Sequence, residues 1–271
     1  MDAVLLFSGQ GAQKVGMGKD LYDQYPVAKA LIEQADKALG ESLSAVMFEG
    51  PGEELTRTCN CQPALYVHGL ACLAVLKELV PSLNPVAAAG LSLGEFTAHA
   101  AAGTYSFEEG LRLVQKRGAF MEEACNATKG TMAAMIGGTD ENVIKLAQEC
   151  DVDVANFNCP GQTVVSGTEE GVAKAVAGAK AAGCKIAKKL NVAGAYHSRL
   201  MHSAMVKLAE ELKNISFGTP SMPVYCNYEA RVVEGPDDIR SMLEHQVCGS
   251  VRWTASMQKL VDQGRARRWP A

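Results

Sequence analysis

The sequence predicts an α/β protein in which a parallel-sheet core carries a small inserted subdomain. In the first half, short apolar runs that end in glycine or serine alternate with longer helical stretches, as in parallel α/β folds. From about residue 130 the predicted order becomes β-α-β-β-α-β, which is the ferredoxin-like pattern. We therefore expect a large unit at residues 1–124 and 191–271, and a ferredoxin-like subdomain at 125–190.

The individual elements of the first half follow from local signals. The apolar run at residues 4–7 ends in Ser8-Gly9 and predicts a buried strand, and residues 86–89 predict a weaker one. Pro26 and Pro63 suit the first turns of helices, and the second helix is apolar almost all round, so it should be buried. Ser106 begins a capping box. The predicted helices are 26–40, 63–79, 95–102 and 106–124.

The remaining elements are predicted in the same way, from apolar runs and the turn-forming residues that bound them. The predicted subdomain consists of strands 132–136, 152–157, 162–166 and 184–192 and helices 140–150 and 168–182. The C-terminal part is predicted to contain helices 200–212, 237–246 and 253–261 and a strand at 224–226. Residues 265–271 fit no element.

Composition excludes several classes of protein. Hydrophobic residues make up 48% and charged residues 21%, which excludes a disordered chain, a collagen and a coiled coil. The net charge is −4 with no basic stripe, so a nucleic-acid partner is not expected. The uncharged stretch at 79–94 is broken by two prolines and too short for a bilayer. Nine scattered cysteines predict reduced thiols in the cytoplasm, and no metal site.

Residues 90–94 match G-x-S-x-G. In this motif a strand turns sharply into a helix, with the serine strained at the tip and glycines where side chains would clash. The N–H after the serine then points to where an oxyanion forms. The apolar run before Ser92 and the helical stretch after it favour a nucleophile. The alternative is an ordinary loop serine. The elbow makes the core α/β-hydrolase-like.

A nucleophilic serine needs a base, and the chain has five histidines. His68 lies in the apolar helix and is expected in the core, and His99 follows the elbow on the same helix and should point away. His197 lies in a small-residue loop after the last subdomain strand, where catalytic side chains are common. By spacing alone, His197 is only the best of the five.

Arg117 is the third candidate. It shares a helix face with Leu113, Phe120 and Met121, and an arginine among apolar residues favours a carboxylate or phosphate partner. The alternatives are a structural salt bridge and a snorkelling side chain. The loop at residues 9–13 lacks the features of a nucleotide-binding loop, and its backbone N–H groups are expected to face the serine.

Seven motifs in order then resemble the malonyl-CoA:acyl carrier protein transacylases. The chain is similar to that family from residue 4 to about residue 263. The matching segments are Phe7–Gln13 (F-P-G-Q-G-S/A-Q), Gln62–Leu65 (Q-P-A), Gly90–Glu95 (G-x-S-x-G-E), Arg112–Gly118 (the arginine helix), Asn156–Gln162 (N-x-N-x-P-G-Q), His197–Met201 (H-x-x-x-M) and Gln246–Trp253 (Q-x-x-x-P-V-x-W).

The resemblance implies the roles at the reacting centre. Ser92 is the nucleophile, and His197 is the base and then the acid. The backbone N–H groups of Gln10 and Leu93 form the oxyanion hole. The main-chain carbonyl of Gln246 orients the histidine, so no catalytic aspartate is needed.

The resemblance also implies the substrates and partners. Malonyl-CoA gives its malonyl group to Ser92, and the phosphopantetheine thiol of holo-acyl carrier protein takes it, in a ping-pong reaction of fatty-acid biosynthesis or of a polyketide pathway. No cofactor or metal is bound, and a cytoplasmic monomer is expected. Arg117 grips the malonyl carboxylate. Four residues are expected to bind substrate near the pantetheine arm or pocket rim: Gln62, Asn156, Asn158 and Gln162.

Departures from the family pattern keep two alternatives open. Leu91 stands where many members have histidine, and Gly249-Ser250-Val251 replaces x-P-V. The family continues with a further strand and helix, so residues 264–271 predict a shortened C-terminal end. One alternative is a serine esterase, which would carry an acidic third member. The other is an inactive fragment that only docks carrier proteins.

Overall fold

The structure is a computed structural model, and it describes residues 1–265. The expectation for residues 264–271 lies largely outside the described residues. In chain order the elements are β1 (Asp2–Phe7), α1 (Lys19–Gln24), α2 (Pro26–Leu39), α3 (Leu43–Glu49), α4 (Gly52–Thr56), α5 (Thr58–Leu79), β2 (Asn84–Gly90), α6 (Leu93–Ala101), α7 (Phe107–Ala127), β3 (Gly130–Ile136), α8 (Asp140–Glu149), β4 (Asp153–Cys159), β5 (Gln162–Thr168), α9 (Glu169–Gly178), β6 (Ile186–Lys189), a 3-10 turn (Arg199–Met201), α10 (His202–Lys213), β7 (Val224–Tyr225), α11 (Pro236–His245) and α12 (Trp253–Asp262).

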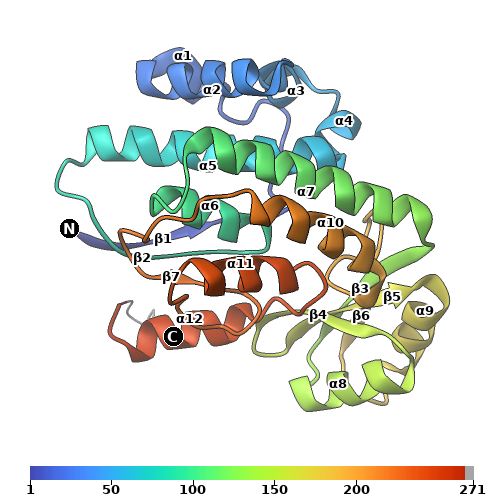
Figure 1. The fold of residues 1–271 in the computed structure, drawn as a ribbon. Helices are drawn as coiled ribbons and strands as arrows, with labels where there is room; N and C mark the ends of the chain where they lie inside the picture. Colours follow the sequence, from blue (N-terminus) through green and yellow to red (C-terminus); the bar gives the residue numbers. More distant parts are fainter. Residues whose placement is uncertain (266–271) are drawn as a thin grey trace.

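A three-stranded parallel sheet forms the centre of the large unit, in the order β1-β2-β7 (Figure 1). Its middle strand, β2, runs directly into the elbow. Helices α5, α6 and α7 cover one face of the sheet, and α12 covers the other with Met257 and Leu260. The predicted parallel core is therefore present, and in the described part of the chain it is narrower than a full α/β-hydrolase sheet.

The second sheet is antiparallel, in the order β4-β5-β3-β6, and with α8 and α9 it has the predicted ferredoxin-like pattern. Alternate residues of its strands face opposite sides. Ala133 and Val165 pack under α8 and α9, whereas their neighbours Met132 and Val164 face the large unit. One face of this small sheet thus supplies its own core, and the other faces the site described below.

A short strand pairing joins the two units. Asn156 of β4 forms a parallel bridge with Val251, which lies two residues before the start of α12. The N–H of Phe157 donates to the Val251 carbonyl (2.9 Å), and the N–H of Val251 donates to the Ala155 carbonyl (2.8 Å). The inserted sheet is therefore hydrogen-bonded to the segment between α11 and α12.

Helix α5 begins earlier than predicted. It starts at Thr58 rather than Pro63, so the proline lies inside the helix. Its missing N–H costs only the bond to Cys59, one turn from the start, which packing offsets. The short helices α1, α3 and α4 had no predicted counterpart, because five to seven residues are too few to show a helical period. The capping box of α7 is confirmed.

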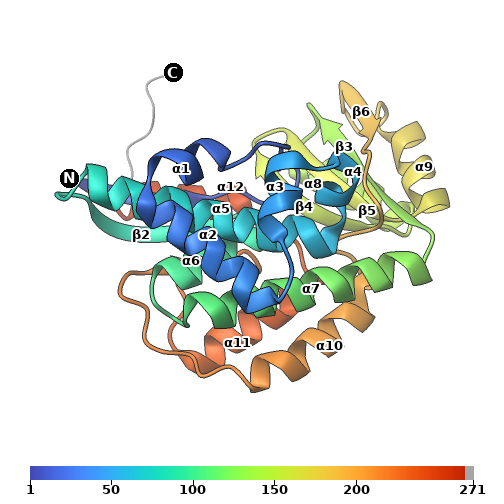
Figure 2. The ribbon, with the colours of Figure 1, turned by 90° about the horizontal axis from the view of Figure 1, so that it is seen from above.

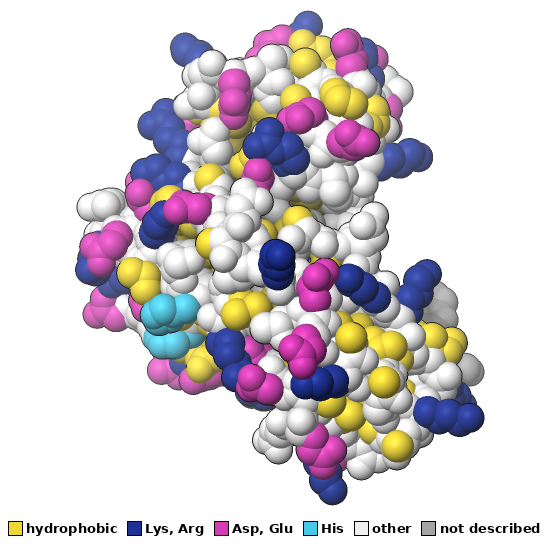
Figure 3. All heavy atoms as spheres, turned by 90° about the vertical axis from the view of Figure 1, so that its right-hand side faces the viewer, with side chains coloured by type: hydrophobic (Ala, Val, Ile, Leu, Met, Phe, Trp, Pro, Cys, Tyr) yellow, Lys and Arg dark blue, Asp and Glu magenta, His cyan; other side chains and the backbone are white. Residues whose placement is uncertain are grey.

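Among the described residues, α5 alone is long and apolar enough to pass for a membrane span, and 56% of its most apolar window is buried in the protein. It packs beneath α2 (Figure 2), where Ala28 meets Ala71 and Val75. All nine cysteines are free thiols. Over the face in Figure 3, basic and acidic side chains are interspersed.

Candidate active site

Ser92 lies at the tip of a strained turn between β2 and α6. Its backbone has φ 53° and ψ −104°, a left-handed conformation that a serine adopts only when its surroundings enforce it. A Cβ on Gly90 would lie 1.9 Å from the carbonyl carbon of Gly94, and one on Gly94 would lie 2.3 Å from the Phe7 carbonyl oxygen. Both glycines are therefore required, and the turn is a nucleophile elbow rather than an ordinary loop.

His197 meets Ser92 across the cavity. Its Nε2 lies 2.8 Å from Ser92 Oγ, and its Nδ1 lies 2.9 Å from the main-chain oxygen of Gln246. Since a carbonyl only accepts, the proton is on Nδ1, and Nε2 is free to accept from the serine hydroxyl. Burial, aided by the charge of Arg117, lowers the pKa of His197 to about 4. The imidazole is therefore neutral, and basic in function, at neutral pH.

The other histidines do not approach the serine. His99 is fully buried, with its Nδ1 3.2 Å from Thr104 Oγ1, and burial lowers its pKa to about 3. His68 is half-buried on α5, and burial lowers its pKa as well. Neither has a hydrogen bond to Ser92 in the described part of the chain.

Arg117 is buried (1% exposed) beside the nucleophile. Its Nη2 lies 3.0 Å from Ser92 Oγ and 2.9 Å from Gln246 Oε1, and its Nη1 lies 2.7 Å from Gln62 Oε1. Desolvation lowers its pKa to about 10, so it stays charged at neutral pH. It forms no salt bridge within the described residues. Its hydrogen-bond partners are all neutral, and the buried carboxylate of Glu95 acts on it only through the Gln246 amide, so Arg117 neither snorkels nor forms a direct salt bridge and can take an anionic ligand.

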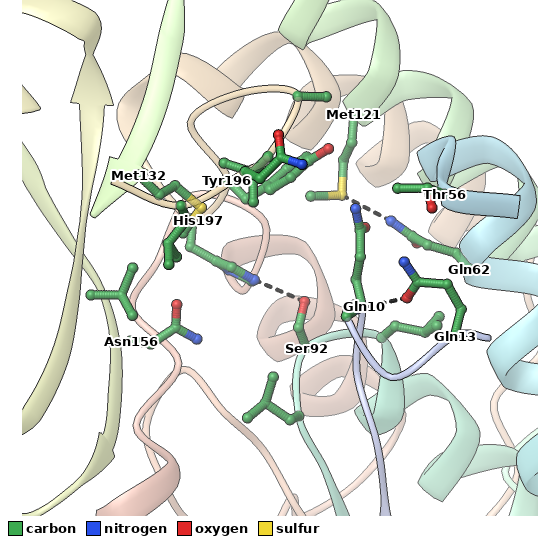
Figure 4. Close-up of a pocket in the computed structure, with 18 of the residues that line it drawn as sticks. Gln10, Gln13, Thr56, Gln62, Ser92, Met121, Met132, Asn156, Tyr196 and His197 are labelled. Atoms are coloured by element: carbon green, nitrogen blue, oxygen red, sulfur yellow. Dashed lines mark hydrogen bonds between the residues drawn. The ribbon is translucent and has the colours of Figure 1, made fainter. Parts of the chain in front are cut away.

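These groups open into one cavity of about 730 Å³ between the two units (Figure 4). Gln10 and Leu93 line it, and no backbone hydrogen bond of either N–H exists among residues 1–265. Leu93 is the first residue of α6, where an N–H has no partner within the helix. Two free donors beside Ser92 can hold an oxyanion.

Three of the four predicted substrate-binding residues line the cavity: Gln62, Asn156 and Asn158. Gln62 also holds Arg117 and donates to the sulfur of Met121 (3.4 Å; Figure 4). Gln162 is different. It begins β5 at the hairpin, where its Oε1 faces the Cys159 thiol (3.7 Å), and it does not line the cavity. The Pro-Gly turn between β4 and β5 carries it away.

Sequence reasoning missed Asn227 altogether, and it gave Glu95, the last residue of the elbow motif, no role in the site. Asn227 Oδ1 accepts the Ser92 N–H (2.6 Å), and its Nδ2 donates to the Gly90 carbonyl (2.8 Å). Glu95 is buried beneath the elbow, and Tyr196 lines the cavity with its hydroxyl 2.7 Å from Thr58 Oγ1. Glu95 carried a signal, since an acidic residue in a fully apolar first turn of α6 needs a partner. Asn227 follows β7, and only the strand order brings it to the elbow.

Comparison with known proteins places this geometry in a family. The acyl transferase domain model matches residues 4–266. The malonyl CoA-acyl carrier protein transacylase of Bacillus subtilis is 43% identical over 264 residues, which cover 96% of this chain and 83% of that protein. The structure of the transacylase from Coxiella burnetii superposes with a TM-score of 0.93 at 35% identity, covering 96% and 84% of the two chains.

A third match is a complex. In it, a malonyl-transacylase is bound to a type II polyketide acyl-carrier protein, and this chain is similar to it with a TM-score of 0.93 at 37% identity, covering 96% and 85%. The resemblance seen in the seven motifs is thus confirmed over nearly the whole chain. The chain belongs to the acyl transferase family, among the malonyl CoA-acyl carrier protein transacylases.

Proposed function

We propose that the protein transfers the malonyl group of malonyl-CoA to the phosphopantetheine thiol of acyl carrier protein, through a malonyl ester on Ser92, in fatty-acid biosynthesis. The observation that carries this proposal is that a neutral histidine and a buried, anion-seeking arginine meet on the same serine oxygen. The histidine activates Ser92 as the nucleophile, and the arginine gives the site its preference for a donor with a free carboxylate.

In the first half-reaction Ser92 is acylated. Its hydroxyl proton passes to Nε2 of His197 as Oγ attacks the thioester carbonyl. The Nδ1–H bond to the Gln246 carbonyl holds the ring in place and stabilises the imidazolium. The N–H groups of Gln10 and Leu93 stabilise the oxyanion, and losing one such donor typically costs roughly 100- to 1,000-fold in rate. The C–S bond then breaks, and the imidazolium returns its proton to the CoA sulfur.

The second half-reaction runs the same steps with the thiol of the carrier protein. His197 takes the thiol proton, the sulfur attacks the malonyl ester carbonyl, and Ser92 leaves with the proton that the imidazolium returns. A base whose partner is a carbonyl rather than a carboxylate suffices, because no step requires a second anionic acceptor. The cavity contains no acidic residue that would make an esterase triad with His197.

Arg117 accounts for donor selectivity. A malonyl group on Ser92 Oγ carries its carboxylate two carbons beyond the ester carbonyl carbon, within reach of a guanidinium that contacts the same oxygen. The planar, charged fork suits a carboxylate, and an acetyl group offers it nothing. The acyl group of a neutral ester has no carboxylate to bind the Arg117 guanidinium, which further disfavours the esterase alternative.

The acceptor and the setting are part of the same proposal. A transacylase of this fold is known in complex with a polyketide carrier protein. We assign this chain a fatty-acid carrier protein, with a polyketide carrier as the second candidate, because both present the same phosphopantetheine thiol. We also propose a cytoplasmic monomer that binds no metal or cofactor. Nine free thiols support a reducing compartment.

Intact-protein mass after mixing with malonyl-CoA tests the proposal. We expect a gain of one malonyl group, absent in Ser92→Ala and removed by holo-acyl carrier protein. Release of CoA without an adduct and without transfer would point instead to hydrolysis. Comparison of a fatty-acid with a polyketide carrier protein as the second substrate then decides the acceptor, and light scattering decides the monomer.

A further inference from the structure

Glu95 is a buried carboxylate beneath the elbow that the mechanism above does not use. It is the third residue of α6 and is 0% exposed. Its Oε2 accepts two hydrogen bonds, from the N–H of Asn227 (2.8 Å) and from Nε2 of Gln246 (2.6 Å). Its Oε1 has no partner among the described residues, and no salt bridge reaches it there. Burying a carboxylate in this way is costly, so its contacts need an explanation.

The contact of Glu95 with Gln246 fixes the direction of the Gln246 side-chain amide. Nε2 of that amide donates to Glu95 Oε2 and to the Ser92 carbonyl (3.1 Å), so its Oε1 must face Nη2 of Arg117 (2.9 Å). Turning the amide over would set its NH2 against the guanidinium and its oxygen against the carboxylate. Both contacts would be repulsive. Glu95 therefore determines that Gln246 presents an acceptor to Arg117.

The contact of Glu95 with Asn227 reaches the backbone of the nucleophile. Asn227 donates its N–H to Glu95, and its side chain bonds both sides of the elbow, at Ser92 and at Gly90. Burial raises the pKa of Glu95 to about 7, which reflects how thoroughly α6 and its neighbours exclude water from this network. One carboxylate thus anchors both the turn that carries the nucleophile and the amide that holds the arginine.

We propose that Glu95 is a positioning residue for acyl selection: through Gln246 it holds Arg117 in place for the donor's carboxylate, and through Asn227 it braces Ser92. It touches neither the acyl group nor the reacting atoms. The inference rests on the proposed function and deepens it. Because only a dicarboxylate donor uses Arg117, loss of Glu95 should harm malonyl transfer more than acetyl transfer.

The test compares two substitutions of Glu95. Glu95→Met keeps the length and removes the acceptor, and we expect the rate of Ser92 loading from malonyl-CoA to fall about 10- to 100-fold, with a smaller fall for acetyl-CoA. Glu95→Gln keeps an oxygen acceptor, and it should stay within about tenfold of wild type with the malonyl preference intact. Glu78→Gln, an exposed carboxylate on α5, is the control and should behave as wild type.

A purely structural role predicts something else. It would lower the fraction of active molecules, seen as the amplitude of the acylation burst, and would reduce loading from both donors by the same factor. An unchanged malonyl-to-acetyl ratio in Glu95→Met would therefore overturn the proposal. If wild type itself forms no malonyl adduct, the proposed function fails instead, and the two failures are distinguished.

Gln246→Ala gives a second measurement in case Glu95→Met does not fold. It keeps the main-chain carbonyl that orients His197 and removes the amide that links Glu95 to Arg117. We expect the same loss of malonyl preference. The double variant Glu95→Met/Gln246→Ala should be no slower than the slower of the two single variants, because both substitutions remove the same link between Glu95 and Arg117. A Gln246→Ala enzyme with the wild-type preference would overturn the proposal independently.

Discussion

The two walls of the active-site cavity are built on different principles. On the wall from the large unit, each polar side chain that touches Ser92 has a further hydrogen-bond partner: Arg117 bonds the Gln62 and Gln246 side chains, His197 the Gln246 carbonyl, and Asn227 the Gly90 carbonyl. On the wall from the small sheet, Asn156 and Asn158 have no side-chain hydrogen bond within residues 1–265, and they stand among apolar Met132 and Val164. The first wall is preorganised for the chemistry, and the second keeps its polar groups free for a ligand.

The largest expected effect on the large-unit wall is the loss of the general base His197. His197→Ala should reduce the rate of Ser92 acylation by about 100- to 10,000-fold, the usual contribution of a general base. The measurement is stopped-flow release of CoA from malonyl-CoA. His202→Ala, an exposed histidine at the start of α10, should leave the rate unchanged. Equal losses in both variants would show that the large-unit wall has no special chemistry.

The next largest effect is expected at Arg117. Arg117→Ala removes the charge-assisted contact to the donor and should lower malonyl loading by about 10- to 100-fold while sparing acetyl loading. Competition between the two donors gives the ratio directly. Arg112→Ala, an exposed arginine on the same helix paired with Glu108, is the matched control. Retention of the malonyl preference without Arg117 would contradict its assigned role.

The pH profile sharpens the comparison in a different way. The pKa of His197 is lowered to about 4, so the imidazole remains neutral above that pH, and acylation should weaken only as pH falls toward 4. Protonation of His197 itself should cost less than about twofold between pH 7 and pH 5, and protonation of Glu95, whose pKa is raised to about 7, should cost no more than Glu95→Gln does. A histidine with the ordinary pKa of about 6.5 would lose about 25-fold over that interval. A midpoint near 6.5 would mean that the base is hydrated rather than enclosed.

The smallest effects are expected on the wall from the small sheet. Asn158→Ala should raise the KM for malonyl-CoA by about 2- to 10-fold with kcat unchanged, because a neutral contact made throughout the reaction adds uniform binding. Gln162→Ala, only four residues along the hairpin but outside the cavity, should change neither constant. A fall in kcat for Asn158→Ala would assign chemistry to this wall and remove the distinction between the two.

The sequence was sufficient where a local rule decides the structure. The capping box of Ser106 fixed the start of α7, and G-x-S-x-G fixed the elbow, because both depend on residues within a few positions of each other. It failed at the start of α5, where packing overrides the tendency of Pro63 to begin a helix. Helices of one or two turns, such as α4, were missed for want of a period.

For the site, the limit was distance along the chain. Spacing alone could not choose among five histidines, and the resemblance to a family pointed to His197, which the structure places 2.8 Å from the serine. Asn227 lies 135 residues from Ser92, and only the pairing of β2 with β7 brings them together. Gln162 belongs to a matching motif but does not line the cavity, so its role in substrate binding stays a prediction.

The bridge between Asn156 and Val251 has a consequence for engineering by recombination. Val251 lies five residues after Gln246, whose carbonyl orients His197. The segment that pairs with the small sheet is therefore the same short segment that positions the catalytic histidine. A subdomain exchanged from a relative to alter carrier preference would need the same two-bond register at this seam. A graft shifted by one residue would turn the alternate side chains of β4 inside out and displace the segment that aims the base.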